Sequence, residues 1–179
     1  HERLIGDEYV APLTKMRSYL DLLDEAGQPP DQRALAALRP KMLALSSQRS
    51  VGAHPYFVPP EHSAVAREAL GPGPLLMPEQ AVLLETDPAA ARATAREFCS
   101  LYLALPNYTN NLRDLGYTDD DLGGGGSDRL IDAIVAWGSP DAIASRVRAH
   151  LDAGADHVCI QVVGSMPPIE AWKMLAPAM

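Results

Sequence analysis

Four short apolar segments, separated by stretches with helical periodicity, constrain the fold of this chain most strongly. They are residues 33–38 (RALAAL), 53–58 (AHPYFV), 80–85 (QAVLLE) and 157–163 (HVCIQVV). Strands that alternate with helices are expected to be parallel, because parallel neighbours need long crossover connections and the helices supply them. A closed barrel of this type has eight strands and roughly 250 residues. Four strands in 179 residues therefore predict half of such a barrel. A small, open, doubly wound sheet is the alternative, although no GxGxxG sequence follows a first strand to favour it.

The intervening stretches carry recognisable helix signals. Leu13, Met16, Leu20 and Leu23 repeat at three- and four-residue steps and predict an amphipathic helix between Pro12 and Gly27. An aspartate followed by a proline predicts another helix start at residues 87–88. Residues 127–138 (SDRLIDAIVAWG) and 139–154 are expected to form two capped helices that each end at a glycine. Residues 106–127 interrupt the rhythm and predict an insertion that is part helix and part loop.

The composition argues against several classes of partner. With 23 acidic and 15 basic residues, the net charge of -8 repels phosphate backbones and anionic lipid, so neither a nucleic-acid nor a membrane partner is expected.

Cys99 and Cys159 are far apart and predict neither a disulfide nor a zinc site, and His54, Glu61 and His62 have no recognised metal-ligand spacing. Without a long apolar run or a signal peptide, the protein is predicted to be cytoplasmic.

Several longer stretches resemble a known family. LAALRPKMLAL, GAHPYFVPPEHSAVAREALGPGPLLMPEQAVLLETDP, LPNYTNNLRDLGYTDDDL, SDRLIDAIVAWG and AGADHVCIQVV are similar to the C-terminal half of bacterial luciferase-like oxidoreductases, in the subgroup described as dependent on coenzyme F-420, a deazaflavin. The resemblance implies a single partial domain over residues 1–179 with the insertion at 106–127. The four apolar segments would be strands five to eight of a (β/α)8 barrel. The chain begins at His1, which indicates a piece of a longer protein that is inactive alone.

The resemblance also implies a cofactor site at the carboxyl ends of the strands, for coenzyme F-420 or, alternatively, FMN. The turn Leu38, Arg39, Pro40 and Lys41 after the fifth strand would hold the phosphate region, and Gln161 in the eighth strand would line the pocket. Relatives tend to have Leu-Gly-Pro where this chain has Leu38-Arg39-Pro40. Arginine can either obstruct the approach of the cofactor or pair with an anion, while the helix N-terminus offers a second phosphate site.

The remaining candidates come with structural alternatives. His54, inside the sixth strand, is the predicted catalytic residue because histidine in general can exchange a proton near neutral pH, but it could also be a structural histidine of the barrel interior. His62 is expected to be a surface residue at a helix start. Asn107, Tyr108, Asn110 and Asn111 in the insertion predict either a lid over the site or a solvated connection between helices.

Three functions are compatible with the sequence, of which the first two are implied by the resemblance. The first is hydride transfer between a deazaflavin and a small organic substrate, and the second is an FMN-dependent monooxygenase. No hydrolase triad or Walker loop competes with them, and cofactor chemistry needs few residues of the protein itself. The third is a non-catalytic half-barrel that pairs its open sheet edges in a homodimer, because uncovered edges favour association.

Overall fold

The computed structural model describes residues 11–179, which form a mixed α/β fold with exclusively parallel strand pairs in this range. The helices are α2 (Pro12–Glu25), α3 (Pro40–Arg49), α4 (Pro60–Leu70), α5 (Pro88–Leu103), α6 (Pro106–Asp114), α7 (Asp119–Leu122), α8 (Asp128–Ile134), α9 (Pro140–Asp152) and α10 (Pro168–Leu175). The strands are β1 (Ala34–Leu35), β2 (Gly52–Ala53), β3 (Leu75–Leu76), β4 (Glu79–Leu83), β5 (Val135–Trp137) and β6 (Cys159–Val162). Short 3₁₀ turns occupy Pro30–Gln32 and Ala176–Ala178.

The strands form two three-stranded parallel sheets of order β1-β2-β3 and β5-β4-β6, which follow each other along the chain at β3 and β4. Only Met77 and Pro78 separate β3 from β4, and the Glu79 amide still donates to the Pro55 carbonyl across 2.9 Å. The four predicted strands therefore lie side by side and point the same way. Each is shorter than its apolar segment, and the sheet does not close into a barrel among the described residues.

The stretch 127–138 was expected to be helical throughout, and this is wrong. The helix α8 ends at Ile134, and Val135–Trp137 form strand β5, which pairs with β4 in the register Ala81↔Val135 and Leu83↔Trp137. The segment that follows β2 makes its last backbone hydrogen bond to β4 at Pro55, so the later part of that edge of β4 is free for β5. A β-branched and an aromatic residue suit this position. Tertiary pairing, rather than local periodicity, decides the structure here.

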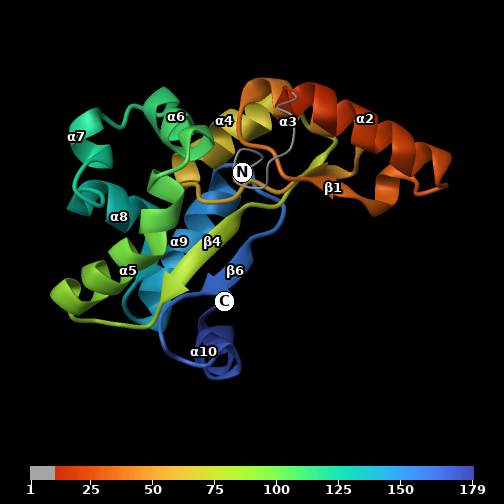
Figure 1. The fold of residues 1–179 in the computed structure, drawn as a ribbon. Coiled ribbons are helices and arrows are strands. Elements are labelled where there is room, and N and C mark those ends of the chain that lie inside the picture. The colour runs from red at the N-terminus through yellow and green to blue at the C-terminus, as the bar shows by residue number, and fades with distance from the viewer. Residues whose placement is uncertain (1–10) are drawn as a thin grey trace.

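Residues of β4 alternate between two faces that are covered by different helices. We call the side of Glu79, Ala81 and Leu83 the inner face; the last two belong to a core cluster with α5 and α8. The outer face carries Gln80 and Val82, and Val82 packs with Ile143 of α9 and Leu175 of α10. Figure 1 shows α5 to α8 gathered on one side of the molecule, α2 and α3 at the upper right and α10 at the bottom.

The helix signals of the sequence are largely confirmed. The predicted stripe of α2 packs against Leu35 and Leu45, with Leu20 fully buried. Asp87 accepts a hydrogen bond from the Ala90 amide at 2.8 Å and so caps α5, and Ser139 caps α9. The insertion contains α6 and α7 followed by the glycine run 123–126, as part helix and part loop.

Candidate functional site

A groove of about 590 Å³ opens on the inner face between α5 and the end of β6. Thr94, Glu97 and Phe98 line it from α5, and Gln161 to Ser165 line it from the other side. We call this the Gln161 groove. The carboxyl ends of parallel strands are where α/β folds usually bind ligands, because side chains from several strands and loops converge there.

The Gln161 side chain is held by two tyrosines. The Tyr56 hydroxyl donates to Gln161 Oε1 at 2.7 Å and lies 2.8 Å from the Tyr102 hydroxyl. Since Tyr56 has one proton to give, Tyr102 must donate to Tyr56. Burial, reinforced by the hydrogen bond with Tyr102, raises the pKa of Tyr56, so its hydroxyl remains neutral. The amide nitrogen of Gln161 has no protein partner in the described chain and remains available as a donor.

An aromatic cluster stands behind this chain of hydrogen bonds. Phe57 stacks on Tyr102 with ring centroids 4.8 Å apart, and Tyr108 meets the Tyr102 ring edge-on at 5.3 Å. Phe98 contacts both Phe57 and Tyr102. These rings come from the turn after β2, from α5 and from α6. Of these rings Phe98 lines the groove, and the others pack behind it.

Glu79, which the sequence reasoning missed, is buried on the same face with 4% of its surface exposed. Its Oε2 accepts from the Phe57 amide at 3.3 Å, and its Oε1 has no hydrogen-bond partner within residues 11–179. Burial raises the pKa of Glu79 to about 7. The signal in the sequence was a glutamate inside the apolar stretch LLMPEQAVLL, which Pro78 made resemble a turn before the strand.

The two histidines differ from each other in their surroundings. His54 is half-buried, and its Nδ1 donates to the Met77 carbonyl at 2.6 Å, which fixes the ring beside β3. Its catalytic role stays a prediction. His62 was expected at the surface, and this is wrong: it is 1% exposed inside α4, where Nε2 donates to the Leu38 carbonyl at 2.7 Å. The helix turns this side chain toward the sheet, and burial lowers its pKa.

The turn after β1 contains the four residues predicted to hold a phosphate. The Arg39 guanidinium is paired with Asp114 at the end of α6, with a distance of 2.8 Å between Nε and Oδ2. Pro40 has no N–H, and the amides of Met42 and Leu43 already donate to the Arg39 carbonyl. The helix N-terminus thus keeps one free amide, that of Lys41, and is a weak phosphate site. The Leu38 carbonyl is occupied by His62.

The predicted lid residues all lie on α6 but face different surroundings. Tyr108 packs in the aromatic cluster, and Asn111 is buried with its Nδ2 unpartnered among the described residues. Asn107 and Asn110 are exposed, and Asn110 Oδ1 accepts from Arg113 at 3.2 Å. The structure brings the Tyr108 ring next to the Tyr56 ring, with centroids 6.5 Å apart. The role of the four α6 residues as a lid remains a prediction.

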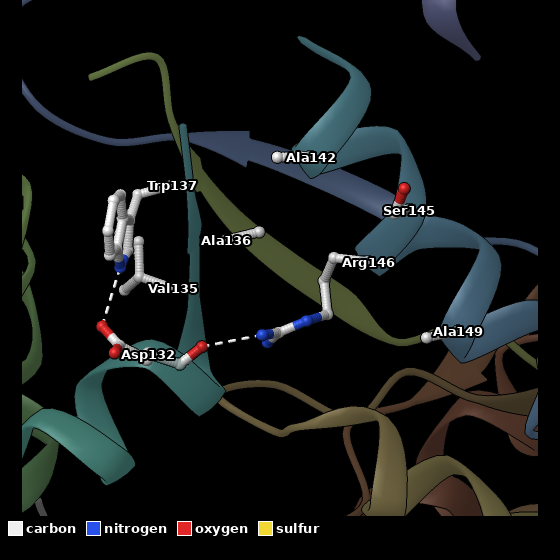
Figure 2. A pocket seen from close by; sticks show the side chains of 8 residues that line it. All are labelled: Asp132, Val135, Ala136, Trp137, Ala142, Ser145, Arg146 and Ala149. Carbon is white, nitrogen blue, oxygen red and sulfur yellow. Dashed lines mark hydrogen bonds between the residues drawn. The ribbon is translucent and has the colours of Figure 1, made fainter. Parts of the chain in front are cut away.

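A second groove, of about 410 Å³, lies between β5 and α9 (Figure 2). Its polar groups bond to each other: Trp137 Nε1 donates to Asp132 Oδ1 at 2.8 Å, and Arg146 donates to the carbonyls of Asp132 and Ala133. Arg146 therefore satisfies the last carbonyls of α8, as a helix C-terminus requires. This groove is explained by the packing of the fold, and the Gln161 groove is the better candidate site.

The described residues show neither a metal-binding cluster nor a membrane-spanning helix. Residues 11–179 contain no group of three or more His, Cys, Asp or Glu side chains that could hold a metal ion. None of the helices in this range is both long and apolar enough to cross a membrane.

Two solved structures have a fold similar to that of this chain. MsnO8 in its apo form matches with a TM-score of 0.61 and 15% sequence identity, over 99% of this chain and 63% of that one. An F420-dependent secondary alcohol dehydrogenase in complex with an F420-acetone adduct matches with a TM-score of 0.54 and 14% identity, over 80% of this chain and 47% of that one. The likeness is one of fold. This chain spans less than two thirds of the length of either protein. No protein-family model and no curated protein matches the sequence.

Proposed function

We propose that this chain is part of a luciferase-like oxidoreductase that transfers hydride between coenzyme F-420 and a small organic substrate. The observation that carries the proposal is the Gln161 groove, which lies at the carboxyl ends of parallel strands in a fold shared with an F420-dependent alcohol dehydrogenase. The deazaflavin would supply the hydride chemistry when bound. The protein supplies binding, orientation and exclusion of water.

The residues of the groove suit the ring of such a cofactor better than its phosphate. The edge of a deazaflavin or flavin ring presents carbonyl oxygens and ring nitrogens. The free amide nitrogen of Gln161 can donate to such an acceptor, because its oxygen is already held by Tyr56. The Phe98 ring lines the groove and offers an apolar surface beside it. For the phosphate, Lys41 and the paired Arg39 are the available charges near α3.

Titration of the intact protein, of which this chain is proposed to be a part, with coenzyme F-420 and, separately, with FMN tests this function. We expect saturable F-420 binding, and we expect Gln161→Leu to weaken it about tenfold because a buried ring acceptor would lose its donor. The matched control is Gln32→Leu, an exposed position in the turn before β1. Binding of FMN with none of F-420 would replace this proposal with the flavin monooxygenase. Failure of both cofactors to bind would contradict either oxidoreductase.

One structural observation also favours self-association. In the described chain β1, β3, β5 and β6 each pair with another strand on one side only. Unpaired strand edges favour association. Sedimentation of the purified protein between micromolar and millimolar concentration tests whether these edges pair in a homodimer. A concentration-independent monomer would exclude such pairing.

A further inference from the structure

Two carboxylates are buried in the described chain, and they have very different partners. Asp121 accepts from Arg129 at 2.8 Å, from Ser127 at 2.7 Å and from the Thr118 amide at 3.0 Å. These bonds lower its pKa and close the N-terminus of α7. Glu79 has one side-chain hydrogen bond, and its other oxygen has no partner in residues 11–179. A buried polar group with so little compensation needs a reason beyond stability.

The single bond of Glu79 goes to a strained turn. Phe57, the residue whose amide donates to Glu79 Oε2, has a φ of 60°, in the left-handed region that β-carbon crowding disfavours. The Glu79 main chain binds the same turn, because its amide donates to the Pro55 carbonyl. Glu79 thus contacts this turn at two points, one through the backbone and one through the side chain.

The residue between those two points is Tyr56. Its hydroxyl is the one that donates to Gln161 Oε1, and the neighbouring Phe57 ring stacks on Tyr102. A change in the Phe57 backbone would therefore move both the Tyr56 hydroxyl and the aromatic cluster. We propose that Glu79 is a positioning residue: by accepting the Phe57 amide it fixes the left-handed turn that holds Tyr56 on Gln161.

The groups that face Glu79 give this role a measurable signature. They are Tyr56 from the turn, Cys99 from α5, Tyr108 from α6 and Cys159 from β6. All four have raised pKa values and are neutral at neutral pH. Within this set a basic group acts on Cys99 alone, and that group is Arg96. Without a cation beside it, Glu79 should release its proton near neutral pH and then attract the Phe57 amide more strongly, since charge strengthens a hydrogen bond.

Fluorine NMR of protein labelled with 3-fluorotyrosine tests the proposal without any ligand. The chain has six tyrosines, and Tyr56→Phe identifies the Tyr56 resonance. In the unmodified protein we expect this resonance to shift as the pH passes through about 7. Glu79→Gln, which keeps an acceptor for the Phe57 amide, should leave the resonance near its original position but abolish the pH dependence. Glu79→Leu removes the acceptor and should displace the resonance at every pH.

An exposed glutamate provides the control for this experiment. Glu68→Gln, an exposed glutamate on α4, should retain the full titration of the Tyr56 resonance. A Tyr56 resonance that does not move between pH 5 and 9 in the unmodified protein, or that titrates equally in Glu79→Gln, overturns the proposal. If Glu79→Leu does not fold by circular dichroism, the comparison between the unmodified protein and Glu79→Gln decides.

The consequence for a cofactor rests on the proposed function. If Gln161 binds the deazaflavin ring, Glu79→Leu should weaken F-420 binding about tenfold, whereas Glu79→Gln should bind with an affinity independent of pH. Absence of F-420 and FMN binding in the unmodified protein would contradict the proposed function and leave the fluorine experiment to decide the role of Glu79. Normal F-420 binding by folded Glu79→Leu would contradict the positioning role alone.

Discussion

Glu79 and Gln80 are adjacent in β4 and both buried, yet they point to opposite faces of the sheet and have opposite hydrogen-bonding situations. Gln80 uses its whole amide: Nε2 donates to the carbonyls of Ala81 and Ile134, each at 2.8 Å, and Oε1 accepts from His150. Glu79 uses one oxygen and leaves the other without a partner among the described residues. The outer face is chemically complete, whereas the inner face is not.

The hydrogen bonds of Gln80 also determine which ring nitrogen of His150 carries the proton. Because Gln80 Oε1 can only accept, His150 Nε2 must carry the proton, and Nδ1 then accepts from the Ser63 hydroxyl at 2.8 Å. The network joins β4, α4 and α9 with every member satisfied. A satisfied network specifies packing, while an unsatisfied group in the same strand points to function.

The largest expected effect comes from breaking the outer network. Gln80→Leu removes the partners of His150 Nε2 and the Ile134 carbonyl, both of them inside the core, and should lower the free energy of unfolding by about 4 kcal/mol. Urea denaturation measures this. Gln32→Leu, at an exposed position, should change the free energy by less than about 0.5 kcal/mol. A loss below about 1 kcal/mol for Gln80→Leu would show that the network is dispensable.

Acid should act on the same outer face. Burial lowers the pKa of His150 to about 4, and burial also lowers that of His62. Unfolded histidines take up protons below pH 6.5 while the folded ones do not, so stability is present above pH 6.5 and lost as the pH falls toward 4. His150 alone should contribute about 3 kcal/mol to this loss. Urea midpoints measured across this range should fall, and His150→Gln should flatten the fall. An unchanged pH profile in that variant would contradict a neutral buried His150.

Part of this structure could be predicted from the sequence. The helix starts at Pro88 and Pro140 were predictable, because an aspartate or serine cap followed by proline is a local signal. The parallel order of the strands followed from the alternation of strands and helices. Gln161 was predictable as a strand residue that could line a pocket.

Other features depend on contacts between distant residues and have no local signal. The strand β5 forms because β2 leaves an edge of β4 free, and His62 is buried because α4 packs against the turn after β1. Glu79 was missed for the same reason. Its burial results from α5, α6 and β6 closing over it, and the Pro-Glu-Gln sequence resembles an exposed turn.

On the inner face, by contrast, the protein should lose stability as the pH rises, because of Glu79. The folded pKa of Glu79 is raised from 4.5 to about 7, so the stabilising contribution of its retained proton is present below pH 4.5 and lost as the pH rises to 7. The expected loss is about 3 kcal/mol. In Glu79→Gln the free energy of unfolding should lose this slope, which urea denaturation at a series of pH values measures. Glu68→Gln, exposed on α4, should keep it. An identical slope in Glu79→Gln would mean that Glu79 is ionised throughout.

The two substitutions with the smallest expected effect on stability should differ most clearly in their effect on ligand binding. Tyr56→Phe removes one hydroxyl on the inner face, and Ser63→Ala removes one on the outer face; each should cost about 1 kcal/mol. Their effects on a ligand should differ. Without the Tyr56 hydroxyl, the Gln161 amide is free to rotate, so F-420 affinity should fall about tenfold. Ser63 contacts His150 on the far side of the sheet, so its loss should leave that affinity unchanged. Equal losses of affinity in the two variants would mean that the groove responds to the stability of the whole fold, and that the orphaned carboxyl of Glu79 marks no special role for the inner face.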